Sequence, residues 1–556
     1  MGIITDIIVK IKEMTKKMLG IKTVEKAFNV TPLLSSEMEN SIKMWSDLYT
    51  GHCPWLREPT FDDPTRITSL GLPQLIASEK ARTALIEFKS EITPAHNDAT
   101  VSDISATDTG AESIQPKEAP NSDRAKFLNY TYTKLKKQLR TQLEYAVAKG
   151  GLVIKPYVTK LDVPVNDYAY SIDFDYIQAD AFYPLSFDTS GKVTEGIFVD
   201  CEVMQNTIYR RVEYHKWQSG KDIIINKAYK CPYGRLDGVN MTSVDLGEEI
   251  PLTEVESWKD IEPVTTVDNI SQPLFAYLKM PGANTIDSSS PLGMSVFHNA
   301  ISLIKDADMQ YSRYLWEYEG GQMAIDIDRD ALYTETDTQG NPHSMMGQLQ
   351  RRLYRTVDLG EADTYNVFAP PLRDASYLDG LNTILMRIED VTALSRGTLA
   401  EVSEEAKTAT ELKILKQRSY QSNSDIQQAV EDCLNDVIYA MNVLCDLYDI
   451  TPSGEYDVSY EWDDSIMTDT EADASLRMLL QQNGVLSRVE NRMWYLGETR
   501  EQAVKAILQN AEEERIVEQL RMINPMDNAD DEDEDGTPKH IQSEKVDSRV
   551  KSGVNE

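Results

Sequence analysis

The sequence of 556 residues lacks most of the features by which enzymes and membrane proteins are recognised. It has no GxxxxGK[ST] loop to hold nucleotide phosphates, and no HExxH or GxSxG motif. The six histidines are spread from His52 to His540 and form no cluster at metal-ligand spacing. No apolar run approaches the roughly 20 residues that a membrane span needs. These absences predict a protein with no catalytic residues, no metal site, no cofactor and no membrane partner.

Cysteine and positive charge are also scarce. The five cysteines are odd in number and include no CxxC pair, which argues against disulfides or zinc and favours a reducing compartment. Lysine and arginine total 56 against 91 aspartate and glutamate residues, so the formal net charge is -35. A protein that binds nucleic acid tightly needs a basic surface to neutralise phosphates. Tight binding of duplex DNA is therefore not expected.

The most informative stretch covers residues 374–448. Apolar residues recur there at steps of three and four, which predicts a helix, a short loop and a much longer helix. The loop, SRGTLAEVSEEAK at residues 395–407, contains Gly397 and a group of acidic residues, Glu401, Glu404 and Glu405. Taken alone, these carboxylates fit either a catalytic cluster or a solvated turn. The segment QRSYQSNSD, residues 417–425, is nearly free of apolar side chains, which predicts an interruption of the long helix.

The remaining segments alternate helical and strand patterns, and the predicted fold class is α+β. The first 20 residues form an amphipathic pattern, typical of a helix that docks on protein, or alternatively on a membrane surface. Helical patterns follow, and then strands rich in Val, Ile, Tyr and Phe occupy residues 152–280. Ser290 and Pro291 form a strong N-cap and N1 signal for a helix that ends near Gly320.

The order of these elements and several local stretches resemble the portal proteins of tailed double-stranded DNA bacteriophages, in particular the group from siphophages of Gram-positive hosts. The stretches are MWSDLYTGHCPW, GLPQLIASEKARTALIEF, SPLGMSVFHNAISLIKDADMQYSRYLWEYEGG, RIEDVTALSRGTLAEVSEEAKTATELK and YLGETREQAVKAIL. The resemblance spans most of the chain, and no single motif carries it.

The resemblance implies a division of the chain into the parts of a portal subunit. In sequence order these are a wing at 1–290 with a mobile loop at about 95–123, a stem helix at 291–319, a clip at 320–373, a second stem helix at 374–394, a tunnel loop at 395–407, a long interrupted wing helix at 408–450, a wing strand at 455–467, a helical crown at 468–524 and a disordered acidic tail at 525–556.

The resemblance also implies the function. Family members form a ring, expected here as a dodecamer, at one vertex of the virion capsid, and double-stranded DNA is packaged and ejected through its channel. The implied partners are other copies of the chain, the terminase large subunit, head-tail adaptors, and the major capsid and scaffolding proteins, with assembly in the host cytoplasm. The implied DNA-channel residues are Arg396, Glu401, Glu404, Glu405 and Lys407. The implied partner-binding residues of the clip are Arg351, Arg352 and Arg355.

The acidic composition fits a conduit, because strong phosphate contacts would slow the DNA that passes through it. Two other classes of function remain open at this stage. One is a nucleic-acid enzyme, such as a nuclease that assembles carboxylates from distant segments, or a terminase component. The other is a structural assembly protein that does not form rings.

Overall fold

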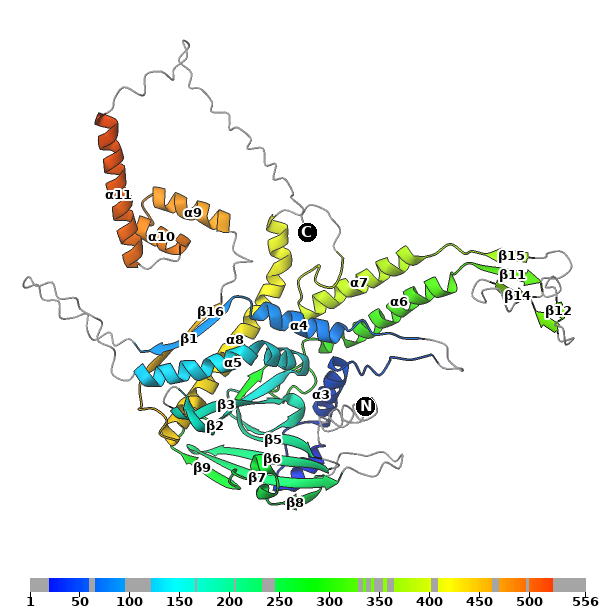
Figure 1. Ribbon diagram of the computed structural model, residues 1–556, viewed down its shortest axis with the longest axis horizontal. Helices are drawn as coiled ribbons and strands as arrows, with labels where there is room; N and C mark the ends of the chain where they lie inside the picture. The colour runs from blue at the N-terminus through cyan, green and yellow to red at the C-terminus, as the bar shows by residue number, and fades with distance from the viewer. Residues whose placement is uncertain are drawn as a thin grey trace, which may run out of the picture. The chain divides into compact units, whose positions relative to one another are not determined.

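The computed structural model of the chain contains two compact units, Met1–Asp464 and Ser465–Glu556 (Figure 1). It describes residues 20–59, 66–95, 122–165, 168–204, 207–232, 246–328, 334–336, 342–344, 354–357, 365–401, 409–462, 470–496 and 500–523. Helices and mainly antiparallel sheets both contribute, so the predicted α+β class is confirmed. Residues 1–19 of the N-terminal amphipathic segment, most of the loop predicted at 95–123 and the whole acidic tail at 525–556 lie outside the described residues.

The N-terminal part of the first unit consists of helices that bury one apolar stripe each. They are α2 (Ile21–Phe28), α3 (Ser36–Tyr49), α4 (Leu72–Ala84) and α5 (Ser122–Lys149). Helix α3 begins where the Ser35 hydroxyl accepts a hydrogen bond from the Met38 N–H, a typical N-cap. Its buried residues follow at helical spacing, namely Met38, Ile42, Trp45 and Leu48.

A three-stranded antiparallel sheet lies against α5. Its order is β10 (Ala276–Lys279), β2 (Gly151–Val165) and β3 (Tyr168–Gln178). Helices α5 and α8 (Ala409–Leu447) both pack against β2, so the core contains apolar residues from helices and sheet together. Strand β1 (Phe88–Pro94) pairs with β16 (Tyr456–Trp462), so the strand expected near residue 455 returns to the N-terminal part of the chain.

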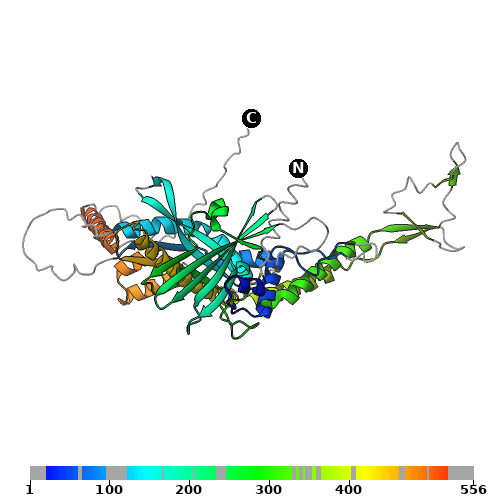
Figure 2. The same cartoon turned by 90° about the horizontal axis from the view of Figure 1, so that it is seen from below.

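A larger antiparallel sheet has the order β4 (Phe182–Phe187), β5 (Val193–Met204), β6 (Thr207–Gln218), β7 (Lys221–Pro232) and β8 (Glu248–Ile250), and β9 (Val264–Asp268) also pairs with β7. Figure 2 shows its long strands as a twisted layer, coloured teal to green. Ser219 and Gly220, both at positive φ, join β6 to β7 in a two-residue hairpin. Such a turn matches the natural twist of the two strands.

Helix α6 (Ile301–Gly320) begins ten residues later than the Ser290-Pro291 signal predicts, so that predicted start is wrong. Residues 291–297 are not helical, and a short 3-10 turn, His298–Ala300, precedes α6. The two serines of this segment bond locally instead: Ser290 accepts from Leu292 N–H, and Ser295 accepts from Phe297 N–H. Such bonds compete with a helix, which explains why the capping residues do not start one.

Helix α7 (Asp374–Thr392) follows closely the prediction for 374–394. Helix α8 runs without a break from Ala409 to Leu447 in Figure 1, so the expected interruption is not present in the helix itself. Only the apolar stripe is interrupted. The polar segment 417–425 stays helical, and its half-buried Ser422 and Asn423 accept hydrogen bonds from Lys80 of α4.

The segment between α6 and α7 contains short strands. Strand β11 (Ala324–Asp328) lies between β14 (Tyr354–Val357) and β15 (Tyr365–Phe368), and β12 (Thr334–Thr336) pairs with β13 (Pro342–Ser344). The second unit contains the helices α9 (Thr470–Gln482), α10 (Arg488–Leu496) and α11 (Arg500–Ile523). Helix α10 begins with a capping box, because Ser487 and Glu490 exchange hydrogen bonds between side chain and backbone.

Candidate functional site

Helices α6 and α7 pack side by side and form the candidate stem (Figure 1). The buried residues at their contact include Ile304 and Ala307 of α6 and Leu381 and Ile388 of α7. Gly380 permits a close approach, since a Cβ there would lie 3.2 Å from Gln310 Nε2. Several large apolar side chains of the pair stay exposed, namely Trp316, Leu378 and Val391.

The helix pair is fixed at the end nearest β11 by Glu317. Arg373, the N-cap residue of α7, donates from Nη2 to Glu317 Oε2 at 2.8 Å and from Nε to Oε1 at 3.0 Å. These hydrogen bonds lower the pKa of Glu317 below its ordinary value. A planar guanidinium that binds a carboxylate through two bonds fixes orientation as well as distance.

The start of the candidate loop folds back over α7 onto the carboxylate of Glu389. This side chain is fully buried, and its Oε1 accepts from the N–H groups of Gly397, Leu399 and Ala400 at 3.1, 2.7 and 3.0 Å. Glu389 Oε2 has no partner in the described part of the chain. Three convergent N–H groups on one carboxylate oxygen make the course of residues 397–400 specific.

Two further contacts extend this arrangement to Glu401. Asn382 accepts from Glu401 N–H at 2.8 Å, and its amide donates to Glu401 O at 3.1 Å. The side chain of Glu401 is left exposed. Residues 395–401 therefore form a defined turn on α7 with a carboxylate at its far end.

The other predicted channel residues have different outcomes. Arg396 forms an ion pair with Asp390 at 2.6 Å, so its guanidinium is already bound by the chain itself. Glu404, Glu405 and Lys407 lie outside the described residues. The structure thus places Arg396 and Glu401 in one turn. The channel roles of all five residues stay predictions.

In the predicted clip, Arg355 is described and Arg351 and Arg352 are not. Arg355 Nε donates to Asp326 Oδ1 at 2.8 Å, and its guanidinium lies 4.8 Å from the centre of the Phe368 ring. These contacts join all three strands of the β14–β11–β15 sheet. About half of the Arg355 side chain remains exposed, so the residue contributes to this sheet and is still accessible to a partner.

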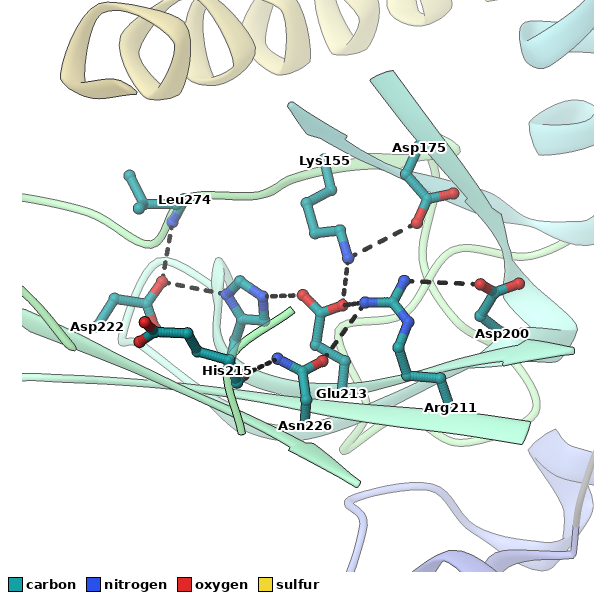
Figure 3. Close-up of polar contacts among 10 residues, drawn as sticks. Lys155, Asp175, Asp200, Arg211, Glu213, His215, Asp222, Asn226 and Leu274 are labelled. Atoms are coloured by element: carbon teal, nitrogen blue, oxygen red, sulfur yellow. Dashed lines mark hydrogen bonds and ion pairs between the residues drawn. The ribbon is translucent and has the colours of Figure 1, made fainter. Parts of the chain in front are cut away.

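A cluster of charged residues links the β10–β2–β3 sheet to the larger sheet that contains β5, β6 and β7 (Figure 3). His215 on β6 contacts Asp222 through Nδ1 at 3.1 Å and Glu213 through Nε2 at 2.7 Å. Glu213 also forms ion pairs with Lys155 of β2 at 2.6 Å and Arg211 at 2.7 Å. Burial raises the pKa of Glu213, but these cations and His215 hold it well below its ordinary value. Burial alone would lower the pKa of His215, and the two carboxylates raise it overall.

This cluster was not predicted as a unit, although its pattern was available in the sequence. Arg211, Glu213 and His215 alternate along a strand, so they share one face of the sheet. Asp173 and Asp175 of β3 form ion pairs with Lys134 and Lys155. Glu213, His215 and Asp222 at its centre are buried, and the ion pair of Glu213 with Lys155 joins β6 to β2.

In the described part of the chain, no group of three or more His, Cys, Asp or Glu residues is arranged to hold a metal ion. None of the helices described has both the length and the apolar character needed to cross a membrane. The five cysteines, all of which lie in the described part of the chain, form no disulfide, and Cys53, Cys433 and Cys445 are buried.

The comparisons with known proteins address the family directly. The model of a family described as phage portal protein, SPP1 Gp6-like, matches residues 114–525. No curated protein sequence matches the chain significantly. The matched region contains the large sheets, both candidate stem helices, the loop between α7 and α8, and the helices of the second unit. It covers well over half of the sequence, and the chain therefore belongs to the SPP1 Gp6-like family of phage portal proteins.

Proposed function

We propose that this portal protein is the subunit of a ring, a dodecamer in the capsid, whose channel conducts double-stranded DNA during packaging and ejection. Membership of a portal family implies a homo-oligomeric assembly at the capsid vertex. The siphophage type and Gram-positive host remain part of the proposal, as do the terminase large subunit, head-tail adaptors, capsid and scaffolding proteins as partners.

The observation that carries the proposal is the paired stem with a defined turn, residues 395–401, at the end of α7. Glu389 and Asn382 fix residues 397–401 against α7, so the turn has one conformation from which the following residues extend. Exposed apolar residues on both stem helices, among them Trp316 and Val391, support packing against neighbouring copies. A ring requires such head-to-tail contacts between two different faces.

The channel acts as a passive conduit in this proposal. Residues 395–407 form the tunnel loop, and the carboxylates of Glu401, Glu404 and Glu405 repel the phosphates and keep the duplex centred. Arg396 and Lys407 make brief contacts with passing DNA. The clip, residues 320–373 with Arg351, Arg352 and Arg355, provides the docking surface for terminase and later for adaptors. The energy for packaging comes from the partner ATPase.

Charge reversal of the loop tests this assignment. The variant with Glu401, Glu404 and Glu405 replaced by Lys should assemble into rings, seen by negative-stain microscopy, and should stall in a DNA-packaging assay with terminase. A matched control replaces three exposed carboxylates of the β7–β9 region, Glu248, Glu256 and Glu262, by Lys, which changes the net charge equally. Normal packaging by the loop variant would contradict the loop assignment. Purified wild-type protein that forms only monomers or filaments would contradict the ring itself.

A further inference from the structure

Lys80 of α4 is a fully buried lysine that connects three elements distant in sequence. Its Nζ donates to Ala393 O at 2.7 Å and to Ser422 Oγ at 3.0 Å, and Asn423 Oδ1 lies at 3.5 Å. Ala393 is the C-cap residue of α7, and Ser422 and Asn423 lie in the polar segment of α8. One ammonium group therefore joins α4, the end of α7 and the middle of α8.

The acceptor on α7 is placed where the candidate loop begins. Ala393 has a left-handed conformation, with φ 52°, and its N–H donates to Glu389 O. Glu389 in turn holds the N–H groups of Gly397, Leu399 and Ala400. The hydrogen bonds of Lys80 and Glu389 thus fix the two sides of the same turn, one from outside α7 and one from within it.

Burial of this cation costs free energy, and packing alone does not require a charged side chain at this position. Burial, together with a smaller effect of the positive charge of Arg418, lowers the pKa of Lys80 to about 8. None of the described carboxylates forms an ion pair with Lys80 in compensation. An apolar side chain of similar length would fill the space without this desolvation. What only the lysine supplies is a set of donors directed at Ala393, Ser422 and Asn423.

The polar segment of α8 is explained by the same contact. Ser419 and Gln427 are buried on this helix beside α4, and Gln427 donates to Ala84 O at 3.2 Å. The apolar stripe of α8 is therefore interrupted where the helix meets α4 through hydrogen bonds. A polar interface of this kind specifies one register between the helices, because any shift would leave buried polar groups unpaired.

We propose that Lys80 is a positioning residue for the tunnel loop, coupling the end of α7 to the polar segment of α8 and thereby fixing the direction in which the loop leaves the stem. The proposal rests on the channel function proposed above. It predicts that the order of residues 397–401 depends on a side chain of α4, far from the loop in sequence.

Hydrogen exchange of assembled rings tests the coupling. Replacing Lys80→Met should increase exchange at the Gly397, Leu399 and Ala400 amides by about tenfold or more, equivalent to the loss of one strong buried hydrogen bond. Exchange in the β5–β7 sheet should not change. The control, Lys43→Met, removes a partly exposed lysine that is paired with Glu39 on α3, and it should leave the loop unaffected. If Lys80→Met fails to fold, Ser422→Ala removes one acceptor alone and should give a smaller increase at the same amides.

The pH profile separates positioning from simple packing. In the wild type, the exchange of the loop amides, corrected for intrinsic rate, should rise between about pH 7 and 9 as Lys80 loses its charge. The charged groups around the junction are Arg418 of α8, Glu389 of α7 and the Glu79–Arg82 pair of α4, and none of the three variants alters them. The rise should be absent in Lys80→Met.

The outcomes distinguish this proposal from the channel function. Unchanged loop exchange in both Lys80→Met and Ser422→Ala, or a rise spread evenly over the whole subunit, would overturn the positioning role. Faster loop exchange together with impaired DNA packaging by intact rings would support both proposals. Faster loop exchange with normal packaging would support the positioning role and contradict the assignment of this loop to the DNA channel.

Discussion

The carboxylate of Glu317 near the end of α6 is bound by Arg373, the residue that precedes α7. Besides the two guanidinium bonds, the Arg373 backbone N–H donates to Glu317 Oε1 at 3.2 Å. The chain leaves α6, forms the β11–β15 region and returns at this contact. The two stem helices are therefore joined at the point where the clip begins and ends.

Neutralising Glu317 should loosen this junction. Its pKa is lowered by the hydrogen bonds from Arg373, so the pair contributes stability above the ordinary glutamate pKa of about 4.3 and loses it as the pH falls through the lowered value. Glu317→Gln should remove this acid dependence from the thermal unfolding midpoint and increase hydrogen exchange at the start of α7. Glu319→Gln, two residues along on the exposed surface, is the control. If the two variants have the same acid dependence of the unfolding midpoint and the same exchange at the start of α7, Glu317 does not join the two helices.

Truncation of Glu389 should disorder the start of the tunnel loop. Glu389→Ala leaves three N–H groups without their acceptor, and we expect a loss of about 1–3 kcal/mol of unfolding free energy, moderated because the turn can reach solvent. Glu389→Gln should cost less, since its amide oxygen still accepts. Urea unfolding gives the free energy, and hydrogen exchange localises the change to residues 397–400. Asp379→Ala, on the exposed side of α7, should be close to neutral. A Glu389→Ala variant as stable and protected as Asp379→Ala would contradict this role.

Arg124 should be among the most sensitive single residues of the first unit. It is 1% exposed at the start of α5 and binds Asp446, Asn442 and Thr451 through five hydrogen bonds. Arg124→Met should cost about 3 kcal/mol of unfolding free energy, because the two acceptors of the buried Thr451 and the carboxylate of Asp446 lose a charged partner. Arg124→Lys should recover little, since an ammonium cannot reproduce the planar fork. Arg82→Met, at an exposed ion pair, should cost under about 1 kcal/mol. Comparable losses for both sites in urea unfolding would refute the expectation.

The sequence was most informative where one pattern governs local structure. The apolar spacing predicted α7 closely, and the alternation of residues predicted the strands, because burial of one face decides both. It failed at Ser290 and Pro291, where the capping signal is present but the serines bond to nearby backbone and α6 begins at Ile301. A local signal cannot show that another local bond is preferred.

Long-range polar contacts were the hardest to predict. Lys80 and Ser422 lie far apart in the chain, and only the fold shows that the polar segment of α8 meets Lys80 of α4. The loop at 395–407 was recognised from the sequence. Glu389, which binds the N–H groups of Gly397, Leu399 and Ala400, looked like one more residue of a helical pattern. Its role depends on the backbone N–H groups of the turn, which the sequence does not encode by residue type.

The buried cluster around His215 should make stability depend on pH above neutrality. The pKa of His215 is raised in the folded state. The charged imidazole therefore contributes fully to the free energy of unfolding at pH values below about 6.5, the histidine pKa in the unfolded chain. This contribution is lost as the pH rises through the raised pKa of the folded state. The pKa of Glu213 is held well below the ordinary value, so this carboxylate stays charged over the same range. The protein should therefore lose stability as the pH rises above neutrality, when His215 is deprotonated and Glu213 remains charged.

Replacing His215→Gln should cost about 3 kcal/mol of unfolding free energy at pH 6, because Asp222 and Glu213 then lack a cation between them. The difference from the wild type should shrink as the pH rises, since the wild type loses the same charge. Unfolding midpoints measured from pH 6 to 9 test this, with His52→Gln at an exposed position as the control. A difference that stays constant with pH would mean that His215 is neutral in the folded protein and contributes only through packing and neutral hydrogen bonds.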